Sequence, residues 1–408
     1  MSASGRARAS ASARSLNFAA YASFVPIGIV TVLLGPMLPT LSARWSLNYS
    51  QAGALFTAQY LASTIAVALS GFLVSRFGFR FAMKTGLLLA AAAVALLLTG
   101  PELLGIICIA AYGAGLGLAV PAANLLVAEV NPERRSSALN LLNFCWSTGS
   151  VACPFLVAAA AKNFHLPLML GLVAGFMLVV AAGIAVMPAS IIEPVAAGNK
   201  NESKAGNFLG IDWKHRALPG LGALFFVYVG TENGFGGWVA SYSKSLGSMS
   251  PAVSTMTPSF FYAALMLGRW IAPLMLRMFN EVRLAQGGLV LACGGMSVLV
   301  LSRTLPGVVT GAGLAGLGLS SVYPISISLL SGEFGPAASR AGSVMFTLSN
   351  LGGGAVPWLV GVSSSRFGSL KAGLALPVIG TVVMFVLYLR DWNAPESPAQ
   401  GSTRGADI

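Results

Sequence analysis

The sequence predicts an all-α integral membrane protein with twelve transmembrane helices arranged as two pseudo-symmetric six-helix bundles. Three observations support this prediction: the composition, a series of twelve apolar windows, and an internal repeat. Of the 408 residues, 56% are hydrophobic and only 9% are charged. Soluble domains carry about 25% charged residues. A surface of the present composition therefore suits a lipid environment rather than water.

Twelve apolar windows follow one another along the chain, each long enough for a membrane-spanning helix. A hydrocarbon core of about 30 Å needs about 20 helical residues. The first six windows cover residues 15–43, 45–75, 85–101, 103–128, 136–161 and 163–192. The other six cover residues 217–243, 245–276, 284–302, 304–332, 341–365 and 372–389. The seventh window contains one charge, Glu232, and the eighth contains one, Arg269.

Other features of these windows agree with helices rather than strands. Transmembrane strands show about ten residues of alternating hydrophobicity, and the windows lack this alternation. The 48 glycines and 21 prolines are typical of lipid-embedded helices that pack closely or kink.

The polar segments between the windows predict the domain boundaries and the orientation. We expect a disordered tail at 1–16, bundles at 17–190 and 217–390, a polar linker at 191–216 and a second tail at 391–408. With both tails on one side, that side holds 17 of the 24 Lys and Arg residues, and the other side holds six. Because short cytoplasmic loops are rich in Lys and Arg, both termini are expected in the cytoplasm, with the protein in the plasma (inner) membrane.

The two halves of the sequence repeat each other. A shift of 203 residues aligns Gly115 with Gly318 and Gly149 with Gly352, and a shift of 202 aligns Gly28 with Gly230. Parallel six-helix repeats are the plan of a large class of secondary transporters, which bind substrate at mid-membrane between the halves. The repeat therefore predicts transport by alternating access. Both halves lie in one chain, so a monomer suffices.

Several other functions are excluded by the same residues. His165 and His215 lie at the edges of windows, so no catalytic or metal-binding histidine cluster is expected within the membrane. The four cysteines show no CxxC spacing. No phosphate-binding loop is present. The formal net charge of +12 does not indicate nucleic acid, because the cations lie in short loops. We expect no enzyme activity, metal or cofactor.

The segment 71–80 resembles a known family motif. It contains Gly71, Arg76, Gly78 and Arg80, and is similar to the Gly-x-x-x-Asp-Arg-x-Gly-Arg-Arg/Lys loop of the major facilitator superfamily. Ser75 stands where the family usually has Asp. The resemblance extends over the whole chain and implies the fold of that superfamily.

The seventh window carries a narrower resemblance. Its pattern Tyr-x-Gly-x-Glu, then Gly-Trp and Tyr, runs from Tyr228 through Glu232 and Trp238 to Tyr242. This pattern is similar to that of the fucose/proton symporter-like and sodium-dependent glucose transporter-like branch of the superfamily. The resemblance implies transport of a sugar, commonly driven by an ion gradient. A proton is the favoured coupling ion, and sodium is the alternative.

Glu232 is the candidate proton-coupling residue, because a carboxylate at mid-membrane is costly unless it has a function. Burial favours the protonated acid. On a helical wheel the same face, about 120° wide, also carries Tyr228, Thr231, Phe235, Trp238 and Tyr242. Carboxylate, hydroxyl and aromatic groups together suit a sugar. The alternative is that Glu232 only bonds a neighbouring helix.

The remaining candidate ligands come from other helices. We expect the substrate to contact a set of amides, hydroxyls and rings: Gln59, Asn143, Ser147, Tyr228, Thr231, Glu232, Phe235, Trp238, Tyr262, Tyr323 and Asn350. For each hydroxyl, packing between helices is the competing interpretation. Buried amides are costly without partners, which favours a ligand role for Gln59, Asn143 and Asn350.

Charged residues at the predicted cytoplasmic helix ends are candidates for gating. The set comprises Arg76, Arg80, Glu129, Arg135, Arg269 and Glu333. Arg269 is the one cation within a window, and we favour a structural or gating role over substrate contact. The other members could form weak, partly solvated pairs that hold one access state closed. The alternative is that they are solvated helix ends.

The scarcity of cations within the windows argues against phosphorylated or dicarboxylate substrates. The sequence therefore favours a neutral, hexose-like sugar carried by proton symport. The main alternative is proton-driven export of drugs or other amphipathic solutes. A sensor or lipid-binding protein of the same fold is a further class. The residues alone leave the solute, the ion and the direction open.

Overall fold

A computed structural model describes residues 3–131, 134–162, 165–186, 215–335 and 338–390. These residues are almost entirely helical. The second tail and all but the last two residues of the predicted linker lie outside them. Residues 3–16, which the sequence predicts as a disordered tail, form the beginning of the first helix instead. This segment is rich in Ala and Arg, which favour helix.

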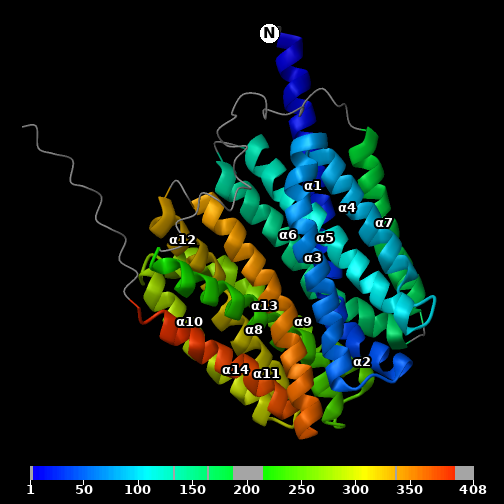
Figure 1. The fold of residues 1–408 in the computed structure, drawn as a ribbon, viewed down its shortest axis with the longest axis vertical. Coiled ribbons are helices and arrows are strands. Elements are labelled where there is room, and N and C mark those ends of the chain that lie inside the picture. The colour runs from blue at the N-terminus through cyan, green and yellow to red at the C-terminus, as the bar shows by residue number, and fades with distance from the viewer. Residues whose placement is uncertain (1–2, 132–133, 163–164, 187–214, 336–337, 391–408) are drawn as a thin grey trace, which may run out of the picture.

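The N-terminal half of the chain, here called the N-half, contains seven helices. They are α1 (Ala3–Val32), α2 (Leu34–Trp45), α3 (Tyr49–Phe77), α4 (Phe79–Leu96), α5 (Glu102–Val130), α6 (Arg135–Lys162) and α7 (Leu166–Val186). In Figure 1 they are coloured from blue to green, and the beginning of α1 extends beyond the other helices.

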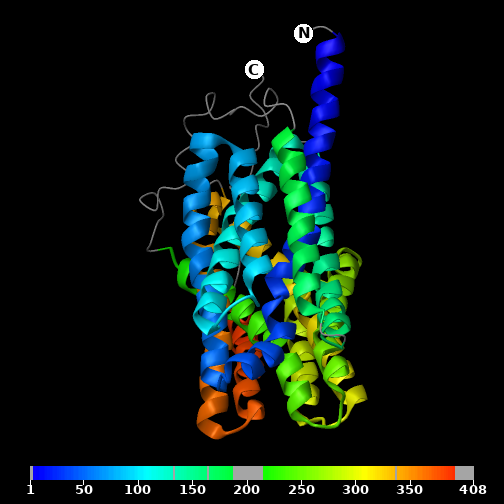
Figure 2. The ribbon, with the colours of Figure 1, turned by 90° about the vertical axis from the view of Figure 1, so that its right-hand side faces the viewer.

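The C-terminal half, the C-half, also contains seven helices. They are α8 (Ala217–Ser245), α9 (Pro251–Met275), α10 (Glu281–Leu301), α11 (Leu305–Leu319), α12 (Val322–Phe334), α13 (Ala338–Phe367) and α14 (Leu370–Leu387). Figures 1 and 2 show the two halves as adjacent bundles.

The fourteen described helices make twelve membrane crossings, because two crossings are broken. The pair α1 and α2 bends by 43° at one residue, and α11 and α12 follow each other across Ser320 and Ser321. Eight helices of the described part are long and apolar enough to span a membrane, counting α11 and α12 as one, and the bent pair makes a ninth. The other three crossings, α8, α9 and α13, have 29, 25 and 30 residues and are more polar.

Some boundaries differ from the apolar windows for a physical reason. The third window begins at residue 85, whereas α4 begins at Phe79. Arg80 and Lys84 belong to the helix, since charged side chains at a helix end reach the membrane surface while the backbone stays helical. A window that ends at charged residues therefore underestimates the length of this helix.

The structure reproduces the sequence repeat as matching contacts. In the N-half, Gly28 of α1 packs against the Trp146 backbone of α6, and Gly149 packs against Val25. In the C-half, Gly352 of α13 packs in the same way against the backbone of α8. A methyl group at Gly28 or Gly352 would meet a carbonyl oxygen. These glycines thus permit the close helix approach that membrane packing uses.

The two halves touch mainly at one end. We call the end where α1 begins and α14 ends the termini side, and the opposite end the far side. Four hydrogen bonds join the halves within the described residues, and all lie at mid-depth or toward the far side. They are Ser50 to Ser365, Thr57 to Gly354, Tyr60 to Asn233 and Ser259 to Val151.

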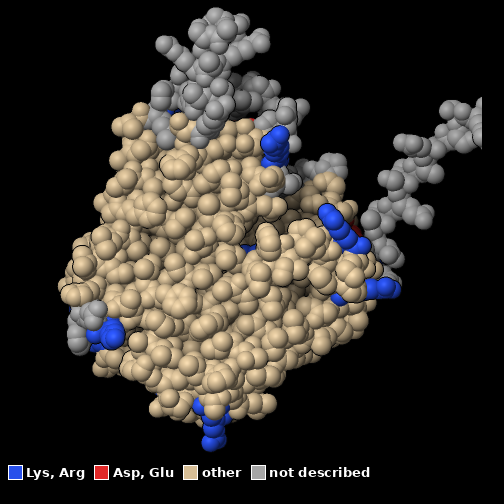
Figure 3. Space-filling view, turned by 180° about the vertical axis from the view of Figure 1, so that it is seen from behind, with Lys and Arg blue, Asp and Glu red and all other residues tan. Residues whose placement is uncertain are grey.

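We call the interface between the two halves the seam. Its termini-side end is more open than its far-side end. Figure 3 shows a broad surface that is largely free of charged residues, with Lys and Arg mainly near its margins and a hollow between the halves toward the termini side. An uncharged belt is the surface expected in contact with lipid. The hydrogen bonds between the halves in the described part of the chain thus lie away from the termini side.

Candidate functional site

Glu232 lies on α8 at the seam between the halves and is partly exposed. Its electrostatic neighbours include the hydroxyls of Tyr60 from α3, Tyr262 from α9 and Tyr323 from α12. Tyr60 belongs to the N-half and the other groups belong to the C-half. The carboxyl group is therefore placed between the two bodies that would move against each other in transport.

Arg269, Tyr228 and Glu232 form a polar network within this site. Tyr228 and Arg269 both lie near enough to Glu232 to interact with it electrostatically, and Tyr228 also lies near Arg269. No direct salt bridge joins Arg269 to Glu232 in the described structure. Tyr228 therefore lies beside both the acid and the guanidinium.

A helix break positions the tyrosine. The interruption at Ser320 and Ser321 leaves the Leu319 carbonyl at the end of α11, and the Tyr228 hydroxyl donates to it over 3.2 Å. The rings of Tyr228 and Tyr323 lie 5.2 Å apart. The last carbonyl groups of a helix lack partners within it, so the Leu319 carbonyl is free to accept this hydrogen bond.

Trp146 brings the N-half into the same site. It lies on α6, is partly exposed, and its indole Nε1 donates to the Thr31 hydroxyl over 3.3 Å. The guanidinium carbon of Arg269 lies 5.9 Å from the Trp146 ring centre, near the outer limit of a cation–π contact. Trp146 is not among the ligands predicted from the sequence, although it directly precedes the predicted ligand Ser147.

Two of the predicted ligands in the N-half follow the same face of α6. Asn143 is exposed and its amide donates to the Leu139 carbonyl, whereas Ser147, one turn deeper, is buried and donates to the Asn143 carbonyl. Asn143 is therefore at the surface of the described structure, and Ser147 is covered by protein.

Gln59 has a different place from the one expected. Its amide nitrogen donates to the Thr31 carbonyl over 3.2 Å, and its oxygen accepts from Tyr112 over 3.2 Å. The side chain is 2% exposed. Gln59 therefore links α3 to α1 and α5 within the N-half, and its polar atoms already have protein partners.

The candidate ligands of the C-half divide into two groups. Asn350 on α13 is partly exposed and makes no hydrogen bond within the described chain, so its amide is available. Thr231 is buried against Gly380 of α14, and Phe235 is buried against Phe261 at a ring distance of 5.4 Å. Thr231 and Phe235 thus face into the C-half rather than toward the seam.

Trp238 belongs to the closed far side. It is 1% exposed, its indole donates to the Pro357 carbonyl over 3.0 Å, and its ring lies 6.1 Å from Tyr49 and 6.4 Å from Phe56. Tyr49 and Phe56 come from α3, so Trp238 joins the halves instead of facing a solute. Deeper on the same seam, Tyr60 donates to Asn233 over 2.6 Å.

The other predicted gating residues lie at the termini side. They are Arg76, Arg80, Glu129, Arg135 and Glu333. Arg80 donates to the Ile184 and Ala185 carbonyls at the end of α7, over 2.6 and 3.3 Å. Arginine at a helix C-terminus stabilises the free carbonyls there, which gives Arg80 a structural role. Gating by the other residues stays a prediction.

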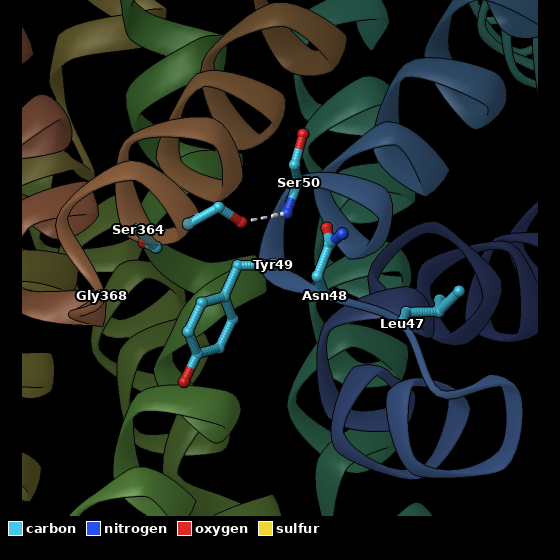
Figure 4. Close-up of a pocket in the computed structure, with 7 residues that line it drawn as sticks. Leu47, Asn48, Tyr49, Ser50, Ser364 and Gly368 are labelled. Atoms are coloured by element: carbon cyan, nitrogen blue, oxygen red, sulfur yellow. Dashed lines mark hydrogen bonds between the residues drawn. The ribbon is translucent and has the colours of Figure 1, made fainter.

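A small cavity opens across the seam on the far side. Its volume is about 600 Å³, and Figure 4 shows its lining at the beginning of α3 and the end of α13. The Ser50 backbone nitrogen donates to the Ser365 hydroxyl across this cavity over 2.9 Å. The cavity lies outside the sealed contacts around Trp238. Within the described residues, no cluster of three or more His, Cys, Asp or Glu side chains is placed to hold a metal ion.

Comparisons with known proteins agree with this architecture. The sequence profile of the Major Facilitator Superfamily matches residues 20–357. The glucose/galactose transporter of Brucella abortus is 24% identical over 379 residues, covering 86% of this chain and 88% of the relative. The solved fucose:proton symporter of E. coli superposes with a TM-score of 0.62 at 18% identity, covering 91% of this chain and 97% of the symporter.

A second solved structure shares this fold. A bacterial homologue of the human lysosomal transporter Spinster superposes with a TM-score of 0.72 at 15% identity, covering 93% and 96% of the two chains. The similarity at these identities concerns the fold. The family profile covers most of the chain, and the internal repeat, the broken helices and the central seam agree with it. This chain therefore belongs to the major facilitator superfamily and is a membrane transporter rather than an enzyme.

Proposed function

We propose that this transporter carries a neutral, hexose-like sugar by proton symport, and that Glu232 carries the coupled proton. The observation that supports the proposal most strongly is the place of Glu232, a partly exposed carboxyl group between Tyr60 of one half and Arg269 of the other. An ionisable residue at the moving interface can meet each side of the membrane in turn.

The groups around Glu232 suit a sugar. Trp146, Tyr228 and Tyr323 offer aromatic rings, and Asn143 and Asn350 offer amides that are at least partly exposed. Rings pack against the C–H face of a sugar, and amides hydrogen bond its hydroxyls. The Brucella relative is a glucose/galactose transporter and the E. coli protein is a fucose:proton symporter, and both support the same substrate class.

The structure corresponds to one stage of the proposed cycle. The far side is closed by the Trp238 and Tyr60 contacts, and the seam is more open toward the termini side. Because the Lys and Arg bias assigns the termini side to the cytoplasm, we propose that the carrier is open to the cytoplasm. A bacterial inner membrane and a monomeric carrier are part of the same proposal.

The decisive experiment is uptake into liposomes that contain the purified protein. Radiolabelled glucose, galactose and fucose would be offered with and without an imposed inward proton gradient, with protein-free liposomes as control. We expect at least one hexose to accumulate above its external concentration only when the gradient is present. If no hexose moves and a lipophilic cation is instead driven outward in exchange for protons, the antiport alternative replaces the proposal.

Sodium is distinguished in the same assay. A sodium gradient at equal pH on both sides should not drive accumulation if Glu232 carries a proton. Accumulation driven by sodium alone would leave the sugar assignment intact and would overturn the proposed coupling ion.

A further inference from the structure

The turn between α9 and α10, on the termini side, carries two arginines that the central seam does not use. Arg277 follows the end of α9, Arg283 lies in the first turn of α10, and both are exposed. Neither guanidinium group has a hydrogen-bond or ion-pair partner in the described part of the chain. Two uncompensated cations at the margin of an uncharged belt (Figure 3) favour an anionic ligand.

The internal repeat gives a structural reason why Arg283 lacks a partner. The shift of 203 residues places Arg283 opposite Arg80, which donates to carbonyl groups at the end of α7, that of Ala185 among them. The same shift places Tyr388 of the C-half opposite Ala185. The Tyr388 carbonyl, however, accepts from the Gln286 amide over 3.0 Å. Gln286 therefore makes the structural contact that Arg80 makes in the N-half, and Arg283 stays exposed.

The acid of this turn points away from Arg283. Glu281 begins α10, and its Oε1 atom accepts from the Ser328 hydroxyl of α12 over 2.9 Å. Residues two apart on a helix differ by about 200° in direction. Because the Glu281 side chain reaches α12, Arg283 leaves α10 on the opposite side and is not neutralised by it.

An exposed apolar face leads along α9 to the same turn. Spacings of four and three residues place Trp270, Leu274 and Arg277 on one face of α9 and of the turn that continues it. Trp270 is 74% exposed, and Leu274 and Met278 are exposed as well. Tryptophan is enriched where the membrane meets water. Apolar surface followed by a cation is the order in which a phospholipid presents its acyl chain and its phosphate.

We propose that the turn between α9 and α10 is a binding site for an anionic phospholipid of the leaflet on the termini side. Arg277 and Arg283 hold the headgroup, since arginine binds phosphate oxygens in pairs. An acyl chain lies along Trp270 and Leu274. The site is separate from the substrate pathway, so the inference does not depend on which solute is carried. A free phosphate ion would use the arginines and not the apolar face.

The first test measures lipid binding to the purified full-length protein in a neutral detergent. Phosphatidylglycerol and phosphatidylcholine with the same acyl chains would be offered in equal amounts, and retained lipids would be counted by native mass spectrometry. Wild type should retain phosphatidylglycerol in preference. Arg277→Gln and Arg283→Gln should each weaken its binding about fivefold. Arg303→Gln, which removes an exposed arginine just beyond the opposite end of α10, is the matched control and should bind as wild type does.

Trp270 reports the position of the lipid independently. Bromine atoms on an acyl chain quench the fluorescence of a tryptophan that they contact. The difference in fluorescence between wild type and Trp270→Phe isolates this ring from the other tryptophans. In phosphatidylcholine vesicles, a minor fraction of brominated phosphatidylglycerol should quench Trp270 more than the same fraction of brominated phosphatidylcholine. The excess should fall with Arg277→Gln and stay with Arg303→Gln.

Three results would overturn the inference. The first is equal retention of the two lipids by wild type. The second is an equal loss of phosphatidylglycerol in Arg303→Gln and Arg277→Gln, which would indicate general surface charge. The third is displacement of phosphatidylglycerol by inorganic phosphate with no headgroup dependence of Trp270 quenching, which would make the turn a phosphate site instead. Sugar transport by wild type would stand in each case.

Discussion

The hydrogen bond between Tyr60 and Asn233 should control how readily the far side opens. It joins α3 of the N-half to α8 of the C-half over 2.6 Å, next to Glu232. Tyr60→Phe removes one neutral hydrogen bond, which contributes about 0.5–1.5 kcal/mol. The bond exists only while the far side is closed, so its loss raises the population of the far-side-open state roughly twofold to tenfold.

The assay is the labelling rate of a cysteine introduced at Thr57, which lies on the same seam and bonds Gly354. The four native cysteines would first be replaced, and a membrane-impermeant thiol reagent would be applied from the far side. Labelling should be roughly twofold to tenfold faster with Tyr60→Phe, provided the open state is the minor one.

Tyr112→Phe is the matched control for this experiment. Its hydroxyl donates to Gln59 inside the N-half, so the bond persists in both access states. Tyr112→Phe should lower stability by a similar amount and leave the labelling rate unchanged. Equal rates for Tyr60→Phe and wild type, or an equal increase in both tyrosine variants, would refute the assignment of Tyr60 to the gate.

Two further predictions concern stability. Gly352→Ala should destabilise the protein by about 1–3 kcal/mol, because the added methyl group would meet the Phe226 carbonyl. The measurement is the thermal unfolding midpoint in detergent. Gly171 has open space around it, so Gly171→Ala is the control and should leave this midpoint unchanged. Arg80→Gln should lower the free energy of unfolding by about 0.5–1.5 kcal/mol, because it releases the Ile184 carbonyl. Sugar exchange per folded molecule should stay at the wild-type level. A large loss of exchange without a loss of stability would instead indicate gating.

Much of the fold could be predicted from the sequence because it depends on local properties. Twelve crossings follow from the distribution of charge, and the repeat follows from glycines such as Gly149 and Gly352, whose contacts match in the two halves. The breaks at Leu33 and at Ser320 were not predicted. Each break falls within an uninterrupted apolar window, so a search for charges gives no signal there.

The site was only partly predictable. Glu232 and Tyr228, which the sequence places on one helix face, lie near each other, and Arg269, for which the sequence favoured a structural or gating role, lies near both. Thr231, on the same predicted face, instead contacts α14. A helical wheel gives the direction of a side chain around its own helix, but it does not show which neighbouring helix lies in that direction. Trp146 was missed because an aromatic residue in an apolar helix is ordinary until its partner is known.

The central claim is that Glu232 carries the proton that drives sugar uptake. The most direct measurement is proton-driven accumulation and sugar exchange in liposomes containing Glu232→Gln, beside Glu102→Gln, a matched acid at the far-side beginning of α5. We expect Glu232→Gln to lose accumulation under an imposed proton gradient yet keep exchange, and Glu102→Gln to keep both. Undiminished proton-driven accumulation by Glu232→Gln would contradict it.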